Sequence, residues 1–162
     1  MYIEVFMQKR MSFDEYFMSM ANLAKLRSTC IRRQVGAVAV REGRVLATGY
    51  NGAPSGMEHC DKESCIRTKL SIPSGEMLDK CYALHAEANT ILQSAIHGVS
   101  MAGCTLYCTC SPCINCMKLL IGVKAKRIVW EAQYPDEFSI HTLERAGYIK
   151  DTESIYHSYI KP

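Results

Sequence analysis

The chain has 162 residues, of which 48% are hydrophobic and 22% are charged. This length allows one domain with a sizeable core and is too short for two ordinary domains, and the composition is that of a soluble globular protein. We therefore expect a single domain over residues 1–162. The net charge of +3 comes without any run of lysine or arginine, so we do not expect the protein to bind nucleic acid.

The first half of the chain predicts a helix, a hairpin and a long loop. A capping box at Ser12 precedes apolar residues at helical spacing, which predicts the helix. Two apolar, β-branched runs flank the turn residues Glu42 and Gly43, which predicts the hairpin. The loop is rich in Gly, Pro, Ser and Cys and has no period. The elements are a helix over about 12–27, strands over 35–40 and 45–50, and a loop over 51–75.

The second half alternates between helical and extended patterns. Ser111 as N-cap and Pro112 at the first position predict the start of one helix, and Gly122 its end. A hairpin followed by such alternation is typical of an α/β protein, with a mixed, about five-stranded sheet covered by helices on both faces. The elements are a helix from Leu84 to the closing Gly98, strands over 105–108, 127–132 and 155–159, and helices over 112–122 and 136–146.

Nine cysteines are many for a chain of this size. No apolar stretch approaches the length of a membrane span, and charged residues interrupt the first eleven positions. We therefore expect neither membrane contact nor a signal peptide and place the protein in the cytoplasm. Because that compartment keeps thiols reduced, the cysteines point to metal binding more than to disulfides.

Two short motifs carry the chemistry. The first is an H-x-E element, His85 and Glu87, and the second is a P-C-x-x-C element that contains Cys113 and Cys116. Both open predicted helices, so two facing helix starts would bring one imidazole and two thiolates to a single zinc ion. Three protein ligands leave a fourth position for water, which is the mark of a catalytic site rather than a structural one.

Glu87 completes the predicted chemistry. Zinc lowers the pKa of a bound water toward neutrality, and a carboxylate kept off the metal can take its proton and return it to a leaving amine. The same paired pattern is the known signature of zinc nucleobase deaminases. Taken singly, the motifs have simpler interpretations: His85 as a core histidine, and the cysteine pair as a zinc knuckle or a redox pair.

Four further cysteines bracket the long loop, and we predict a second zinc site from them. A loop without a core of its own needs a cross-link to be stable. Four thiolates can form a closed tetrahedral zinc site, and His59 could replace one of them. The alternative is that these are unliganded, partly buried thiols. The candidate ligands are Cys30, Cys60, Cys65 and Cys81.

Beyond these motifs, the sequence resembles deoxycytidylate (dCMP) deaminases from Phe13 to about Gly147. The residues that carry the resemblance are Leu26–Cys30, Gly49–Gly56, His85–Asn89 and Thr105–Tyr107 leading to Ser111–Cys113. The G-Y-N-G-x-P-x-G stretch is the discriminating part, because many zinc deaminases lack it.

This resemblance implies a three-layer α/β/α cytidine-deaminase-like fold and the conversion of dCMP to dUMP, which supplies the precursor of thymidylate. Many relatives are hexamers that dCTP activates and dTTP inhibits, through a site that includes the loop with Gly52, Pro54 and Gly56. The resemblance therefore implies a homo-oligomer, with a hexamer favoured, and an effector site. Residues 51–81 would form an insertion in this fold, stapled by the second zinc.

The resemblance also suggests three substrate contacts. Asn51 resembles the residue that contacts the deoxyribose, although an Asn before Gly is also a common turn residue. Arg27 is a candidate phosphate ligand, since a guanidinium matches a phosphate bidentately, or else a solvated arginine at a helix end. Tyr134 lies where relatives place an aromatic near the nucleotide, or else serves only in packing.

Other functions share parts of this pattern. A dCTP or (deoxy)cytidine deaminase is the nearest alternative, and a tRNA adenosine deaminase has a similar core but would need a basic, aromatic-rich face. A noncatalytic zinc scaffold is an answer of a different class. It would have no need for the carboxylate of Glu87 beside an open zinc position, so Glu87 favours an enzyme.

Overall fold

A computed structural model describes residues 10–133 and 136–162 of the chain. Its helices are α1 (Phe13–Lys25), α2 (Ile66–Lys69), the 3₁₀-helix η1 (Leu78–Lys80), α3 (Ala86–Ile96), α4 (Ile114–Gly122) and α5 (Glu137–Arg145). Its strands are β1 (Gly36–Arg41), β2 (Arg44–Tyr50), β3 (Thr105–Cys110), β4 (Arg127–Ala132), β5 (Ile149–Lys150) and β6 (His157–Ile160).

The strands form one mixed sheet in the order β2-β1-β3-β4-β6-β5, in which only β3 and β4 pair in parallel. The predicted α/β class and mixed sheet are confirmed, and the sheet has six strands rather than about five. The additional strand, β5, has two residues, which is too short to give a periodic signal in the sequence.

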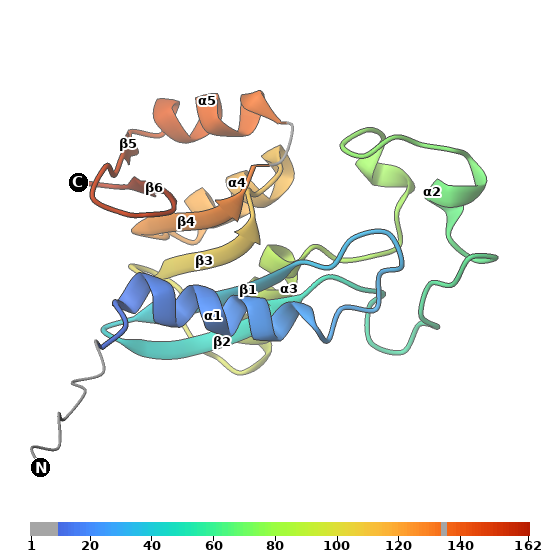
Figure 1. Cartoon of the computed structure of the whole chain (residues 1–162), viewed down its shortest axis with the longest axis horizontal. Coiled ribbons are helices and arrows are strands. Elements are labelled where there is room, and N and C mark those ends of the chain that lie inside the picture. The colour runs from blue at the N-terminus through green and yellow to red at the C-terminus, as the bar shows by residue number, and fades with distance from the viewer. Residues whose placement is uncertain (1–9, 134–135) are drawn as a thin grey trace, which may run out of the picture.

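One face of the sheet is covered by α1 (Figure 1). The capping box is present, because the Ser12 hydroxyl accepts from the Glu15 amide and the Glu15 carboxylate accepts from the Ser12 amide. Phe17 and Met18 of α1 are buried against alternate residues of β1, such as Val38. The ring of Phe17 lies 5.5 Å from that of Tyr107 in β3.

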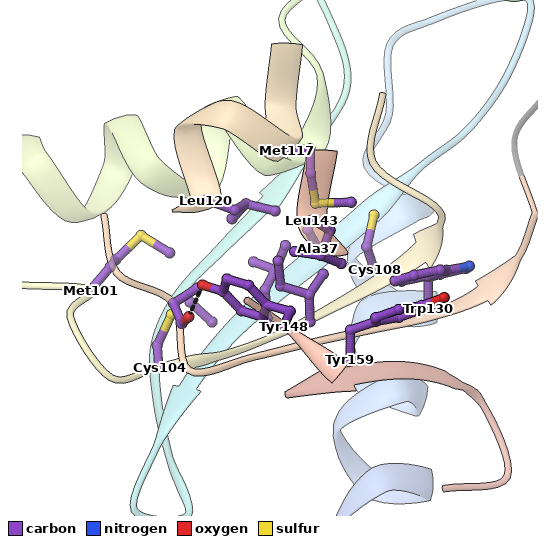
Figure 2. Packing of buried hydrophobic residues seen from close by; sticks show 14 of the residues in the cluster. Ala37, Met101, Cys104, Cys108, Met117, Leu120, Trp130, Leu143, Tyr148 and Tyr159 are labelled. Carbon is purple, nitrogen blue, oxygen red and sulfur yellow. Dashed lines mark hydrogen bonds between the residues drawn. The ribbon is translucent and has the colours of Figure 1, made fainter. Parts of the chain in front are cut away.

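The opposite face carries α3, α4 and α5 and the larger part of the core (Figure 1). Met117 and Leu120 of α4 and Leu143 of α5 are fully buried there. Figure 2 shows the rings of Trp130 and Tyr159 stacked at the edge of this cluster, with centroids 5.6 Å apart. The Tyr148 hydroxyl donates to the Ala125 carbonyl. Helices on both faces confirm the three-layer arrangement.

Two predicted helix starts are wrong by a few residues. The third predicted helix begins at Ile114 with Cys113 as N-cap, not with Ser111. Leu84 precedes α3 and pairs with Gly52 in an antiparallel bridge. This bridge is a long-range contact that a local helical pattern does not reveal, and it takes the backbone of Leu84 out of the helix.

The segment from 51 to 81 is mostly irregular, as predicted, but it contains α2 and η1. Figure 1 shows it extending past the end of the sheet formed by β1 and β2. Because Gly52 and Leu84 exchange both backbone hydrogen bonds, at 3.1 and 2.9 Å, the segment leaves and rejoins the fold at one place. No helix within the described ranges is long and apolar enough to cross a membrane.

Candidate functional site

Three candidate zinc ligands meet where α3 and α4 begin. His85 is the N-cap of α3, Cys113 is the N-cap of α4, and Cys116 lies in the first turn of α4. The Nδ1 atom of His85 lies 3.4 Å from the Sγ of Cys113 and 3.5 Å from the Sγ of Cys116. The two facing helix starts expected from the sequence are therefore present.

The spacing of these three atoms fits zinc. With Zn–N near 2.0 Å and Zn–S near 2.3 Å, a tetrahedral ion holds nitrogen and sulfur ligands roughly 3.5 Å apart. Among the described residues, no other group of three or more His, Cys, Asp or Glu side chains places its ligand atoms within 4.8 Å of one another. His85, Cys113 and Cys116 can hold one ion and leave a fourth position open.

The two thiols of this group are hydrogen-bonded to each other, and their pKa values are shifted in opposite directions. Hydrogen bonds from Cys116 and from His85 lower the pKa of the Cys113 thiol. The hydrogen bond with Cys113 and burial raise the pKa of the Cys116 thiol. The hydrogen bond with Cys113 also raises the pKa of His85, against the effect of its burial. The positive ends of two helices further favour thiolates at this place.

Glu87 is the acid/base candidate, and its side chain is only 4% exposed. Burial raises the pKa of its carboxyl to about 7, and the nearby His85 acts in the opposite direction. The carboxyl also contacts the Cys116 thiol. A carboxyl whose pKa is near neutrality can both accept and return a proton, as hydrolytic deamination requires.

The start of α3 is held against the end of β2. A Cβ atom added to Gly49 would lie 2.4 Å from the Ala86 carbonyl oxygen and 2.6 Å from the Thr90 amide. The Asn89 side chain donates to the Tyr50 carbonyl at 3.0 Å. The close approach of β2 to α3 therefore needs a glycine, and it fixes the helix turn that carries His85 and Glu87.

The start of α4 is held by Asp136, which reasoning from the sequence missed. One carboxylate oxygen of Asp136 accepts from the Ile114 amide at 2.7 Å, and the other accepts from the Ser139 amide at 3.1 Å. Asp136 thus caps α4 in place of a local side chain and also caps its own helix α5. An Asp before a helix is a usual sign of one cap, but nothing in the sequence reports the second.

The metal-binding group opens on a cavity of about 360 Å³. Glu87 and His85 lie in its wall together with Asn51 and Cys110, and three arginines, Arg32, Arg33 and Arg67, also line it. Glu87 is the only acidic residue among the described residues that line the cavity. Away from Glu87, the cavity therefore carries positive charge.

Asn51 lies in this cavity and is 8% exposed. Its side-chain oxygen accepts from the Ser28 hydroxyl at 2.7 Å and from the Val35 amide at 2.8 Å, and its amide nitrogen donates to the Arg33 carbonyl at 2.8 Å. These bonds hold residues 28–35 beside β2. An amide nitrogen carries two N–H groups, so one remains for a ligand hydroxyl.

The other predicted contact residues lie elsewhere. Arg27 is exposed just after α1 and does not line the cavity, and neither do Gly52, Pro54 and Gly56. Gly52 lies under Thr29, whose hydroxyl a Cβ at this position would approach to 2.3 Å. Tyr134 lies outside the described residues. The geometry thus adds no support to Arg27 as a phosphate ligand.

The four cysteines around the insertion all line the cavity. Burial raises the pKa of the Cys60 thiol, and the neighbouring thiols of Cys65, Cys81 and Cys30 raise it further. The four thiols therefore lie in the same cavity, although their sulfur atoms are not within the spacing that groups His85 with its two cysteines.

Comparisons with known proteins agree with this site. A family profile described as the cytidine and deoxycytidylate deaminase zinc-binding region matches residues 11–132. Deoxycytidylate deaminase of Schizosaccharomyces pombe is 39% identical over 153 residues, which cover 91% of this chain and 47% of that protein. Deoxycytidylate deaminase of Mycobacterium phage D29 is 39% identical over 133 residues, which cover 79% of this chain and 98% of that protein.

A solved structure extends the likeness to the backbone. The crystal structure of dCMP deaminase from the cyanophage S-TIM5 in complex with dCMP and dUMP matches with a TM-score of 0.69 and 32% sequence identity. The match covers 85% of this chain and 96% of that chain. This chain thus spans about half the length of the fission-yeast relative and nearly the whole of the two phage relatives.

Proposed function

Because this chain belongs to the cytidine and deoxycytidylate deaminase family, we propose that it is a zinc-dependent enzyme that hydrolyses dCMP to dUMP and ammonia. The resemblance to this family that the sequence indicated is thereby confirmed. The observation that carries the proposal is the placement of the buried Glu87 carboxyl next to the group of His85, Cys113 and Cys116, with Glu87, His85 and Cys113 lining one cavity.

Each residue of the group has a separate part in the reaction. His85, Cys113 and Cys116 would hold zinc, whose chemistry when bound is to act as a Lewis acid that makes water a nucleophile near neutral pH. Glu87 accepts a proton from the attacking water. It then returns this proton to the departing amine, so that dCMP and water give dUMP and ammonia in balance.

The remaining substrate contacts are part of the same proposal. Asn51 would donate its remaining N–H to a sugar hydroxyl, and the support for this contact is that Asn51 lines the same cavity as Glu87. Arg27 for the phosphate and Tyr134 near the nucleotide remain predictions from the resemblance.

We further propose a structural zinc held by Cys30, Cys60, Cys65 and Cys81. Its support is that all four thiols are free and line the same cavity, and that they bracket a segment with little regular structure. A closed four-thiolate site would stabilise this segment, which has no extensive core of its own.

The assembly and regulation of the enzyme are carried over from the family resemblance. We propose a cytoplasmic homo-oligomer, with a hexamer favoured, in which dCTP and dTTP act through the loop of Gly52, Pro54 and Gly56. This loop lies at the entry to the insertion, next to residues 28–35 that border the cavity. The product dUMP would feed thymidylate synthesis.

A substrate panel tests the activity. The purified protein, loaded with zinc, is incubated with dCMP, dCTP, deoxycytidine and CMP, and loss of the cytosine absorbance is followed with and without dCTP or dTTP as effectors. We expect dCMP to be the preferred substrate. Absence of turnover with every compound would refute the enzymatic function, and a preference for dCTP or deoxycytidine would replace the substrate.

A further inference from the structure

Arg67 is a buried charge that the predicted machinery does not use. It lies in the four-residue helix α2 of the insertion and is only 7% exposed. Lysine and arginine are almost never buried to this degree unless a partner balances the charge. Its surroundings therefore indicate what Arg67 binds.

Arg67 has no acidic partner among the described residues. Its guanidinium donates one hydrogen bond, to the Pro73 carbonyl at 2.6 Å, although it carries five N–H donors. Arg127 is also well covered, but unlike Arg67 it forms ion pairs with both Asp14 and Asp151. A buried guanidinium with unused donors and no carboxylate partner can bind an anion that enters the cavity.

The same side chain lines the cavity that contains His85 and Glu87. An anion bound by Arg67 would therefore lie in the cavity that also contains His85 and Glu87.

The wall beside Arg67 is built around this arginine and Arg32. Arg67 donates to the Pro73 carbonyl, and Arg32 donates to the Ile72 carbonyl at 2.8 Å. The next two residues, Ser74 and Gly75, line the cavity. The two arginines thus hold the segment of the insertion that lines the cavity, and they bring two positive charges to the same place.

We propose that Arg67 binds the phosphate of the nucleotide substrate, and that the insertion is thereby the part of the chain that selects a nucleotide over a nucleoside. This inference rests on the proposed function. A planar guanidinium can hold two phosphate oxygens at once and keep the bond to Pro73. Arg67 then takes the place that the sequence suggested for Arg27, which is exposed and outside the cavity.

The test compares a nucleotide with a nucleoside in one variant. For Arg67→Gln, we expect kcat/KM for dCMP to fall about 100-fold, the range for charge-assisted hydrogen bonds, while kcat/KM for deoxycytidine changes by less than about threefold. Arg67→Lys keeps the charge and a donor for the Pro73 carbonyl, but it lacks the paired N–H donors of a guanidinium. We therefore expect kcat/KM to fall about tenfold for dCMP and not for deoxycytidine. Arg44→Gln, at an exposed position outside the cavity, is the matched control and should leave the ratio of the two substrates unchanged. Arg27→Gln is measured beside it, because a loss confined to that variant would assign the phosphate to Arg27 instead.

A binding measurement separates this inference from the activity. Calorimetry on the zinc-loaded protein compares dUMP with deoxyuridine, which differ only in the phosphate. The wild type should bind dUMP more tightly, and Arg67→Gln should lose about 100-fold of that preference. An equal loss for both ligands, no preference in the wild type, or a change in preference in Arg27→Gln alone would overturn the proposal. Failure of dCMP turnover in the wild type would instead overturn the proposed function.

Discussion

The Nδ1 atom of His85 lies 3.4 Å from the Sγ of Cys113, although 28 residues separate the two in the sequence. Each residue is the N-cap of a helix, and both helices pack on the same face of the sheet. The site therefore depends on how the sheet holds two helix starts together, as well as on the ligands themselves.

The content of zinc is the first prediction. We expect two zinc ions per chain in the wild type. Cys116→Ser should lose one together with activity, because it removes a ligand of the catalytic group, and Cys60→Ser should lose the other. Metal analysis of the purified proteins measures both.

Cys104→Ser is the control for these variants. Cys104 is fully buried in the core and does not line the cavity, so its variant should keep both ions. One zinc per chain in the wild type would remove the structural site, and a zinc-replete Cys116→Ser would contradict the catalytic assignment.

Gly49 tests how the sheet positions α3. A Cβ at this position would lie 2.4 Å from the Ala86 carbonyl oxygen, so Gly49→Ala must push the start of α3 away from β2. We expect a loss of about 2 kcal/mol in the free energy of unfolding and a larger loss of activity, since His85 and Glu87 move with the helix. Gly122→Ala has nothing within 4 Å and should be neutral or slightly stabilising in the same urea titration. Equal stability and activity of the two variants would show that β2 does not position the site.

Asp136 tests the corresponding contact at α4. Asp136→Ala removes the acceptor for the Ile114 amide, next to Cys113, and should cost about 1 kcal/mol of stability as a lost cap does. We also expect weaker zinc binding, measured by competition with a chelator, because the turn that carries the thiols is less well fixed. Glu137→Ala, at an exposed position of the same helix, should leave zinc affinity unchanged. Unaltered zinc affinity in Asp136→Ala would mean that this contact serves stability alone.

The ion pair of Asp14 with Arg127 predicts a dependence of stability on pH. Burial alone would raise the pKa of Asp14, but hydrogen bonds from Arg127, Ser154 and Tyr107 outweigh it and lower the pKa to about 2. Because the folded pKa lies below the usual 3.8, the stabilisation is complete above that value and is lost as the pH falls toward 2. Asp14→Asn should therefore lower the free energy of unfolding by about 2 kcal/mol at pH 7.

This difference is measured by urea denaturation of wild type and Asp14→Asn at several pH values, with a chelator present so that loss of zinc does not contribute. It should stay constant from neutral pH down to about pH 5 and shrink below pH 4. Asp79→Asn is the control and should have no effect, because within the described part of the chain Asp79 pairs only with Lys80, at an exposed position. A difference that is independent of pH down to pH 3 would contradict the assignment.

Much of the fold followed from local patterns. The capping box at Ser12, the turn at Glu42 and Gly43 and the apolar strand runs are signals carried by neighbouring residues, and the structure contains the elements that they predict. The predicted helix starts were wrong where a contact with a residue far away in the sequence determines the start of the helix. Leu84 pairs with Gly52 across the insertion, and α4 receives its cap from Asp136.

Some residues of the candidate site could likewise be predicted from local sequence motifs, and others could be found only in the structure. His85, Glu87, Cys113 and Cys116 were found because their chemistry demands fixed residue types at fixed spacing. Arg67 gave no such signal, since an arginine in an irregular segment is usually solvated, and only its burial without an acidic partner distinguishes it. Asn51 proved to be held by three hydrogen bonds that no short motif reports.

The most direct test of the account is the rate of dUMP formation from dCMP by zinc-loaded Glu87→Gln, measured beside the wild type and the exposed control Glu76→Gln. Glutamine keeps the shape of the side chain but cannot accept a proton, and Glu87 is not a metal ligand in this account. We predict full zinc content with a rate lowered about 1000-fold or more in Glu87→Gln, and an unchanged rate in Glu76→Gln. A zinc-replete Glu87→Gln protein that forms dUMP at the wild-type rate would contradict the account.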